Sequence, residues 1–344
     1  MSTSAVYKYG QAGIQNSGFG TAATPTFTLP LTGTYQDSPT IQRADFDSGR
    51  WVNQFIEQRV ADYATFTLSG AAFFEMLPVI HNAAWNDTAP VGSDPYAYDY
   101  TLDIDGDPVT PTPYTFRFGG NEDIGGTGPA IQIQDGYVES YSLTGNFNSR
   151  EISFDSSWFG LKVDDNSGAG YTFAATAIPS TLGLMRFPYG TLSYQDATTT
   201  GGDFATMTDF ACTLLDWKLS CNNINKPKWC ADAGALTFQG LQVATPEIMF
   251  EATLRTDSTS YAAVAAKANA ASPTYQELQF TLTGADSRQA IFNFTGRWAH
   301  VQNVHEVAND ELVMKATFMA QGYPSQTTTP HAFGYEIDTQ WNHT

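Results

Sequence analysis

One stretch of the sequence occurs twice, and this repeat limits the folds that the chain can adopt. Residues 135–160 (DGYVESYSLTGNFNSREISFDSSWFG) align without a gap with residues 295–320 (TGRWAHVQNVHEVANDELVMKATFMA), and we call this the repeat alignment. Few residues are identical, but Gly136 falls on Gly296 and the order of apolar and polar positions is kept. A repeat of about half the chain indicates two copies of one domain.

The length of the chain agrees with this interpretation, because 344 residues exceed what one hydrophobic core usually organises. We expect a first domain over residues 1–168, which includes an N-terminal arm, and a second over residues 169–344, which includes a C-terminal extension. The Asn-, Ser- and Gly-rich residues 164–170 are the expected linker. Apolar residues make up 42% of the chain, aromatic residues 14%, and Gly occurs 29 times, which favours strands and turns over long helices.

Each copy has the pattern of strands around one short helix. Residues 63–68 alternate as a strand, and apolar residues then recur at helical spacing up to Trp85, with Ser69 as the expected N-cap. The second copy repeats this order with a strand at 247–254 and an Ala-rich helix that begins after Asp257.

A hairpin follows the helix in each copy and leads into the repeated stretch. Its strands are expected at 114–118 and 130–134 in the first copy, and at 277–284 and 290–296 in the second. One helix against many antiparallel strands predicts a mainly β (α+β) fold. Strand alternation predicts that the following side chains face a core: Ile152, Phe154, Leu215, Trp217, Leu219, Cys221, Leu312, Met314 and Phe318.

One segment, residues 85–113, has no counterpart in the second copy. The chain between Leu68 and Phe118 is about twice as long as the chain between Leu254 and Phe280. The surplus holds six Asp and no Lys or Arg. A long loop outside a shared core is free to acquire a contact, so we predict an assembly loop that reaches a neighbouring ring of subunits. The residues expected to act there are Trp85, Asp94, Tyr96, Tyr98, Asp103, Asp105 and Asp107.

The net charge of −19 and the pI near 4.4 argue against a surface that grips phosphate, because nucleic-acid binding depends on Lys and Arg. Residues 1–13 lack the apolar segment of a secretion signal, and no apolar run is long enough to span a membrane. We therefore expect a soluble protein that is made in a cytoplasm.

The sequence predicts no catalytic residue, no cofactor-binding residue and no metal site. It contains no GxSxG, HExxH or P-loop motif, and its five His are scattered. Residues 103–107 (DIDGD) resemble part of a calcium loop, but Thr101 and Thr112 stand where an EF-hand needs carboxylates. Calcium at residues 103–107 remains an alternative to a solvated acidic loop.

The three cysteines, Cys212, Cys221 and Cys230, are too far apart in the sequence for a zinc-binding pair. Cys221 and Cys230 are close enough in sequence to form a disulfide across a loop. The alternative, which we expect for a cytoplasmic chain, is that the cysteines are reduced and packed as small hydrophobic residues.

Three segments resemble the tail tube proteins of long-tailed bacteriophages. They are residues 19–25 (FGTAATP) with Leu29-Pro30, residues 63–85 (YATFTLSGAAFFEMLPVIHNAAW) and the closing strands of the repeat; Tyr189-Gly190-Thr191 echoes the first of them. The resemblance implies tandem β-sandwich domains, each with a flanking short helix, that join side by side into rings with a continuous inner barrel. It also implies that the rings stack into the DNA conduit of a virion tail, and that no residue is catalytic.

Most members of this family resemble one copy of the domain, and the resemblance implies rings of six such copies. Two fused copies therefore imply that three chains close a homotrimeric, pseudo-hexameric ring. The implied partners are copies of the chain itself and the tail terminator and tip proteins. Phage DNA would pass through without specific binding, which suits an acidic chain. No membrane is involved.

Two functions of other classes remain open. The first is a carbohydrate-binding β-sandwich protein of a virion or cell surface, in which Trp85, Tyr96, Tyr98 and Tyr100 form a stacking platform. The second is an acidic glycosidase that uses a pair of the many carboxylates.

Overall fold

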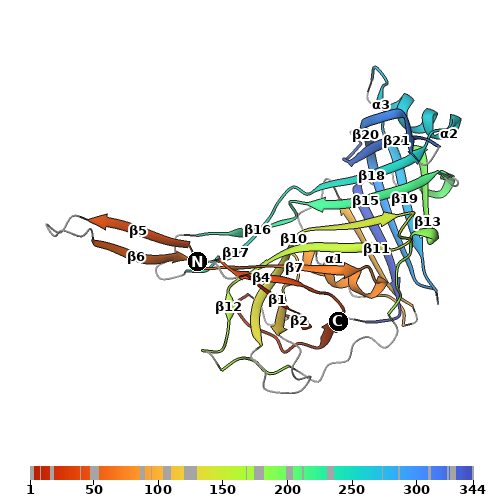
Figure 1. Cartoon of the computed structure of the whole chain (residues 1–344). Helices are drawn as coiled ribbons and strands as arrows, with labels where there is room; N and C mark the ends of the chain where they lie inside the picture. The colour runs from red at the N-terminus through yellow and green to blue at the C-terminus, as the bar shows by residue number, and fades with distance from the viewer. Residues whose placement is uncertain are drawn as a thin grey trace.

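A computed structural model of the chain consists mainly of antiparallel strands with a few short helices, which confirms the expected mainly β fold (Figure 1). The structure describes residues 4–342 except for 8, 16–18, 39, 47–53, 86–89, 94, 104–109, 120–129, 168, 174–181, 199–203, 211–212, 231–235, 273, 286, 309–310, 324 and 326–330.

The largest feature is a continuous run of strands that we call the shared sheet. Its strands from the first half of the chain, in spatial order, are β4 (Gly33–Asp37), β7 (Ala64–Ala71), β11 (Ile152–Gly160) and β10 (Ile131–Asn146). Its strands from the second half are β15 (Leu214–Asn222), β18 (Glu247–Arg255), β21 (Glu311–Ala320) and β20 (Gln289–Ala308). β10 pairs with β15, so one sheet crosses both halves.

A second layer of strands forms behind each half of the shared sheet, because β10 and β20 are long enough to take part in both layers. The first residues of β10 pair with β9 (Tyr114–Gly119) and β12 (Val163–Asp164), and β9 continues to β2 (Tyr9–Ile14) and β3 (Phe27–Leu29). The first residues of β20 pair with β19 (Gln276–Thr283) and β22 (His331–Thr339), and β19 continues to β13 (Gly190–Asp196) and β14 (Thr208–Asp209).

Two more strands lie at the edges of these layers. β1 (Ser4–Tyr7) pairs with β4, and β8 (Tyr96–Asp103) pairs with β22. Two hairpins leave the shared sheet at the same end: β5 (Thr40–Phe46) with β6 (Gln54–Ala61), and β16 (Asn225–Lys228) with β17 (Gly240–Val243). Figure 1 shows the first hairpin projecting away from the body of the molecule.

The helices stand at the two places where helical spacing predicts them. The first is η1 (Phe74–Met76) followed by α1 (Leu77–Trp85), and the second is α2 (Ser258–Ser260), η4 (Tyr261–Ala265) and α3 (Ala266–Ala268). Asp257 caps the second helix, since its carboxylate accepts from the Ser260 amide. Single 3-10 turns form at η2 (Phe187–Tyr189) and η3 (Phe204–Thr206).

The expected N-cap of the first helix is wrong. Ser69 lies inside β7, where its amide and hydroxyl both donate to the Thr32 carbonyl. The strand therefore runs further than its alternating residues indicate, and the helix begins only after Ala72. Pro78 is tolerated because it lies in the first turn of α1, where its missing N–H has no intrahelical partner.

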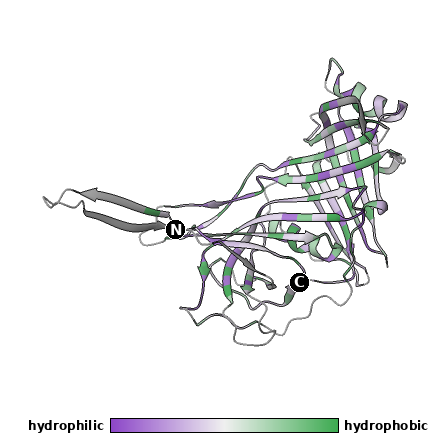
Figure 2. Cartoon of the chain, viewed as in Figure 1, coloured by the Kyte–Doolittle hydropathy of each residue, from purple (hydrophilic) through white to green (hydrophobic). Residues whose placement is uncertain are grey.

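The core is formed where the layers face each other, and residues of both halves belong to one cluster. In the first half Phe116 packs against Phe66 and Trp158, with ring centroids 4.8 and 5.0 Å apart. In the second half the rings of Trp217 and Phe280 are 4.4 Å apart. Figure 2 shows hydrophobic and hydrophilic residues alternating along these strands, as expected for a sheet with one buried face.

The predicted inward side chains are buried with two exceptions. Leu312 is 46% exposed and its neighbour Val313 is fully buried instead, because the pairing of β20 with β21 shifts near this end. Leu215 is half-buried, beside the bulge that separates Leu214 from Asp216 in β15.

The two repeated stretches pair their strands in the same way as far as Gln302, beyond which the register of β20 on β21 shifts a second time. Between β10 and β11 the register shifts at one place, between Val138 and Ser140. Between β20 and β21 it shifts between Trp298 and His300, which is the same place in the repeat alignment. A bulge at equivalent positions is a local detail of the backbone that composition alone does not produce.

The first strands of each half also pair alike. Tyr35 of β4 lies opposite Phe66 of β7, and Leu219 of β15 lies opposite Phe250 of β18. We call the alignment that places Tyr35 on Leu219 and Phe66 on Phe250 the opening alignment. Equivalent positions are further apart along the chain in the opening alignment than in the repeat alignment. This difference locates the surplus of the first half between β7 and β10, where residues 85–113 lie.

Candidate assembly surface

Residues 85–113 are not a loop throughout, because Trp85 ends α1 and Tyr96–Asp103 form the strand β8. β8 pairs along its whole length with β22, which belongs to the other half of the chain. Trp85 and Tyr98 are 3% and 1% exposed, and the Trp85 ring stacks on that of Tyr100 with centroids 5.7 Å apart. Tyr96 is half-buried against the same core. The expectation of a loop outside the core is therefore wrong for these residues.

The structure describes little of the acidic residues of the predicted assembly loop. Asp103 is the last residue of β8, but its side chain is not described. Asp94, Asp105 and Asp107 lie outside the described residues. The possible calcium site at residues 103–107 therefore falls almost wholly outside the described part of the chain. Among the residues that are described, no group of three or more His, Cys, Asp or Glu is placed to hold a metal ion.

The aromatic residues that suggest a carbohydrate platform are not displayed on the surface. Trp85 and Tyr98 are core residues, and Tyr96 and Tyr100 pack against that core. A stacking platform needs an accessible ring face, so these four residues do not supply one in this structure.

Two of the cysteines are described, and they are not bonded to each other. Cys221 is buried and Cys230 is exposed. Burial raises the pKa of the Cys221 thiol to about 12, so this cysteine is inert and packs as a small hydrophobic residue. The expectation of packing is wrong for Cys230, and Cys212 lies outside the described residues.

The described histidines show no catalytic arrangement. His81 is fully buried in α1, and its Nε2 lies 2.9 Å from the Tyr141 hydroxyl. Burial lowers the pKa of His81 to about 3, so its ring is neutral. His300 is exposed on β20 and contacts the Gln302 side chain.

The face of the shared sheet that points away from the core, which we call the polar face, was not identified from the sequence. Core and surface side chains alternate along each strand, so the polar face carries every second residue. Ser and Thr predominate on it. One row of directly opposed residues crosses the sheet from β11 to β20: Ser153, Thr144, Lys218, Glu251, Thr317 and His300.

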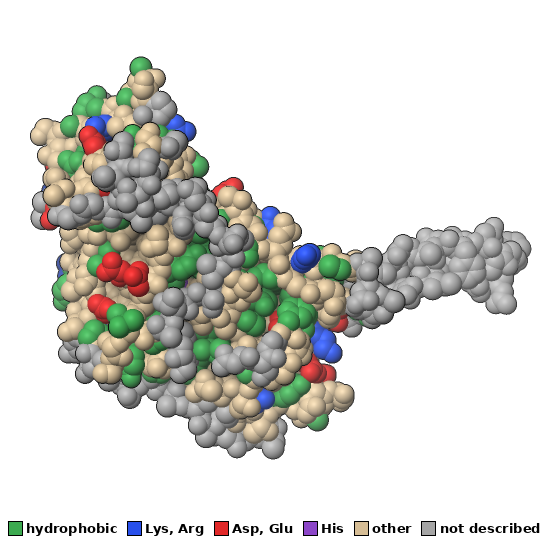
Figure 3. Space-filling model, turned by 180° about the vertical axis from the view of Figure 1, so that it is seen from behind, with side chains coloured by type: hydrophobic (Ala, Val, Ile, Leu, Met, Phe, Trp, Pro, Cys, Tyr) green, Lys and Arg blue, Asp and Glu red, His purple; other side chains and the backbone are tan. Residues whose placement is uncertain are grey.

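The polar face is hollowed on both sides of the junction between the two halves. One depression of about 520 Å³ lies between Asn146 and Lys315, and another of about 480 Å³ lies between Thr67 and Met249. Lys218 and Glu251 line both depressions, so carboxylates and amines are interspersed there. On the opposite face of the molecule, the described Lys and Arg side chains that Figure 3 displays stand singly and form no basic patch.

A buried carboxylate marks the point where β10 passes from one layer to the other. Asp135 has a positive φ of 52° and accepts hydrogen bonds from the Gly20 amide at 2.9 Å and the Gln15 side chain at 2.6 Å. The Gln15 Oε1 atom accepts in return from the Asp135 amide. Burial raises the pKa of Asp135 to about 6, against the opposing effect of these hydrogen bonds.

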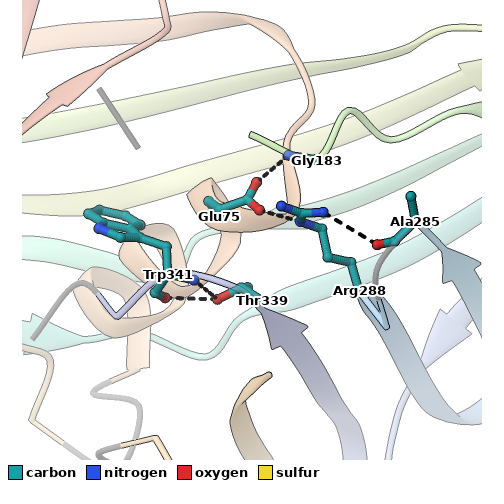
Figure 4. A network of polar contacts seen from close by, with 6 residues as sticks. All are labelled: Glu75, Gly183, Ala285, Arg288, Thr339 and Trp341. Atoms are coloured by element: carbon teal, nitrogen blue, oxygen red, sulfur yellow. Dashed lines mark hydrogen bonds and ion pairs between the residues drawn. The ribbon is translucent and has the colours of Figure 1, made fainter. Parts of the chain in front are cut away.

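A buried ion pair joins the halves beside the first helix (Figure 4). Arg288 Nε donates to Glu75 Oε1 at 2.6 Å, and the Gly183 amide donates to Glu75 Oε2 at 2.8 Å. Both charged side chains are at most 5% exposed. Arg288 also reaches the Ala285 carbonyl at 3.4 Å. These bonds tie η1 of the first half to the turn between β19 and β20 of the second.

The two edge strands of the shared sheet differ in whether another described strand pairs with their outer side. Beyond β4 the only described partner is β1, whose residues 4–7 pair with residues 33–36 of β4. At the other end, residues 297–308 of β20 pair with β21 on one side, and no described strand pairs with their other side. Unpaired edges are templates for another strand.

No protein-family model matches the chain, and no curated protein is found to be similar to it in sequence. Within the described residues, none of the helices is both long and apolar enough to cross a membrane.

The alternation of polar and buried residues along the strands indicates the polar face in the sequence. Ser140, Ser142 and Thr144 alternate with buried residues in β10, as Ser153 does with its neighbours in β11. What the alternation does not give is the order of the strands, so the continuous face across both halves requires the pairing of β10 with β15.

Proposed function

We propose that the chain is a structural protein that assembles with copies of itself into the tube of a phage tail. In this proposal it consists of two tandem tail-tube-like β-sandwich domains, each with a short flanking helix. The observation that carries the proposal is the pairing of β10 with β15, because this contact between the halves has a natural counterpart between separate chains.

The counterpart follows from the two alignments. In the repeat alignment β10 corresponds to β20, and in the opening alignment β15 corresponds to β4. The contact between β10 and β15 inside one chain therefore predicts a contact between β20 of one chain and β4 of the next. Both of these strands stand at the ends of the shared sheet. Repeating the contact around an axis produces a closed ring, and the resemblance to tail tube proteins implies six domains in it, hence three chains.

The polar face is the proposed lining of the bore. Closing the shared sheets of three chains into a barrel leaves no unpaired edge toward the lumen. Hydroxyl groups and mixed charges such as Lys218 and Glu251 bind phosphate weakly compared with a basic groove. A wall of this composition lets phage DNA pass without specific binding, in agreement with the net charge of −19.

The proposed partners are copies of the chain, which form stacked rings, and the tail terminator and tip proteins at the ends of the tube. The proposed location is the virion tail after assembly in the host cytoplasm. No catalytic role is proposed, and the two alternative functions receive no specific support from the described residues.

Electron microscopy of the purified protein over a range of concentrations tests the proposal. We expect rings with a central bore and stacked tubes as the concentration rises, with three chains per ring. Monomers alone at every concentration, together with hydrolysis of a member of a glycan panel, would refute a structural role.

A further inference from the structure

β1 occupies the edge of the shared sheet at which the proposed ring closes. Its four residues pair antiparallel with β4, from Ser4 opposite Gln36 to Tyr7 opposite Gly33. The other side of β4 pairs with β7 through Tyr35 and Phe66. β1 therefore completes the hydrogen bonding of a strand that is otherwise an open edge.

The equivalent edge in the second half is the outer side of β15, where a long strand of the sheet is paired. β15 corresponds to β4, and its outer side pairs with β10, from Tyr141 opposite Cys221 to Asn146 opposite Asp216. β10 continues the shared sheet there, whereas β1 covers β4 with a strand of only 4 residues. The position that β1 takes on β4 is thus the position that β10 takes on β15.

The strand that fits this position in a ring is β20 of a neighbouring chain. The repeat alignment places Tyr141 and Ser142 on Val301 and Gln302. In β20 the side that corresponds to the β15-bound side of β10 has no described partner beyond position 296. Among the described residues, one chain therefore carries an edge of β20 without a strand partner, the donor edge, and an edge of β4 that β1 covers, the acceptor edge.

We propose that β1 is a displaceable strand that covers the acceptor edge of β4 until β20 of a second copy replaces it. This inference rests on the proposed ring assembly and adds a control step to it. Each hydrogen bond that β1 loses is replaced by one from β20, so the exchange is nearly balanced in backbone bonds, and the longer strand adds pairs. While β1 is bound, the subunit can pair only in the fraction of time that the edge is open, which lowers its apparent affinity for a neighbour by that fraction.

The cover also has a protective use. A bare edge on a long sheet pairs indiscriminately with other chains, and natural proteins protect such edges. A short strand of the same chain protects β4 before assembly without removing the edge permanently. Strand replacement of this kind is a known mode of protein association through main-chain hydrogen bonds.

A reversible staple between β1 and β4 tests the inference. Val6 and Thr34 lie opposite each other, so Val6→Cys with Thr34→Cys in a Cys230→Ser background forms a disulfide that fixes β1 in place. We expect the oxidised form to stay monomeric under conditions in which its reduced form assembles. The matched control is a staple of β13 to β14, Ser193→Cys with Asp209→Cys, which should assemble in both redox states.

Deletion of residues 1–7 is the second variant. It removes the cover, so assembly should begin at a concentration at least about tenfold lower than for the full chain, as measured by light scattering and microscopy. Assembly of the oxidised staple, or an unchanged threshold after the deletion, would overturn the inference while leaving ring assembly intact. If no form assembles, including the full chain, the proposed function fails and the inference fails with it.

Discussion

At Glu75 a single carboxylate connects the first half of the chain to the second. Its partner Arg288 lies 213 residues further along, and both side chains are excluded from water. Such a pair adds little net stability compared with apolar residues, but a buried charge that loses its partner is costly. The consequence can be tested with a matched exposed pair, Lys267 and Asp196, whose charged atoms are 2.8 Å apart.

We expect Glu75→Ala to lower the free energy of unfolding by about 3–5 kcal/mol, because it leaves the Arg288 guanidinium buried and unpaired. Asp196→Ala should change it by at most about 1 kcal/mol, since water screens the exposed pair. The double variant Glu75→Leu with Arg288→Met should recover most of the loss. Urea unfolding measures all three, and equal losses for the buried and exposed variants would contradict the assignment.

Asp135 gives the fold a dependence on pH with a definite sign. Its pKa is raised from 3.8 to about 6 in the folded protein, so folding favours the protonated carboxyl. Its contribution to stability is complete below pH 3.8 and is lost as the pH rises through 6. We expect Asp135→Asn to remove this decline, because Asn is neutral and tolerates the positive φ of this position.

The measurement is the difference in unfolding free energy between variant and parent at pH 4.5 and pH 7.5. Asp164→Asn is the control of opposite sign. Burial raises the pKa of Asp164, but hydrogen bonds from Tyr171 and Asn166 outweigh burial and lower it. Its stabilisation is therefore lost as the pH falls. If Asp135→Asn and the parent keep the same pH profile, the carboxyl is ionised without cost at pH 7.5.

Residues of this kind lie beyond what the sequence can predict. Alternation identifies Phe154 and Trp217 as core residues, because their neighbours along the strand are polar. Nothing local marks Glu75 or Asp135, whose partners lie 213 and 120 residues away. Their burial depends on which strands meet, and that information is absent from any short window of sequence.

At the scale of elements, β8 shows that part of residues 85–113 is a paired strand of the fold. The sequence predicts that residues 85–113 are present in one half only. It does not show that they complete the second layer of the other half, because the strand signal of Tyr96–Asp103 is interrupted by acidic residues. Replacing the segment with a short Gly-Ser turn should therefore damage the fold itself and not only an assembly contact.

The prediction for β8 concerns its buried and outward residues. Tyr98→Ala should lower the free energy of unfolding by about 3–5 kcal/mol, because a fully buried aromatic ring is lost. Asp99→Ala, the neighbouring change on a residue that is exposed, should cost less than about 0.5 kcal/mol. Thermal unfolding of both variants checks this, and a small effect of Tyr98→Ala would show that β8 is dispensable for folding.

At the scale of the whole molecule, the internal junction specifies a register between chains. The pairs Tyr141–Cys221 and Ser142–Ser220 become Val301–Asp37 and Gln302–Gln36 under the two alignments. The repeat in the sequence predicts two copies, but this register needs the observed pairing of strands. It leads to a test of the number of chains in a ring.

A chain with Gln36→Cys, Gln302→Cys and Cys230→Ser should form disulfides between neighbours in assembled rings. Denaturing gels should then show covalent dimers and trimers and nothing larger from one ring, because three chains close the circle. Gln36→Cys in the same background, without the second cysteine, should stay uncrosslinked. Bands up to six chains would refute the trimeric ring, and an absence of bands in intact rings would refute the register.

The distance in sequence between β8 and β22 also has a consequence for the order of events during synthesis. The Tyr98 hydroxyl donates to Asn342, 244 residues further along the chain. At typical rates of translation the ribosome needs on the order of 10 to 50 s to cover that length. During this time β8 has no partner strand. A nascent strand with carboxylates at Asp99 and Asp103 repels copies of itself on neighbouring ribosomes. The acidic character of the segment thus suits a strand that must wait for the last part of the chain.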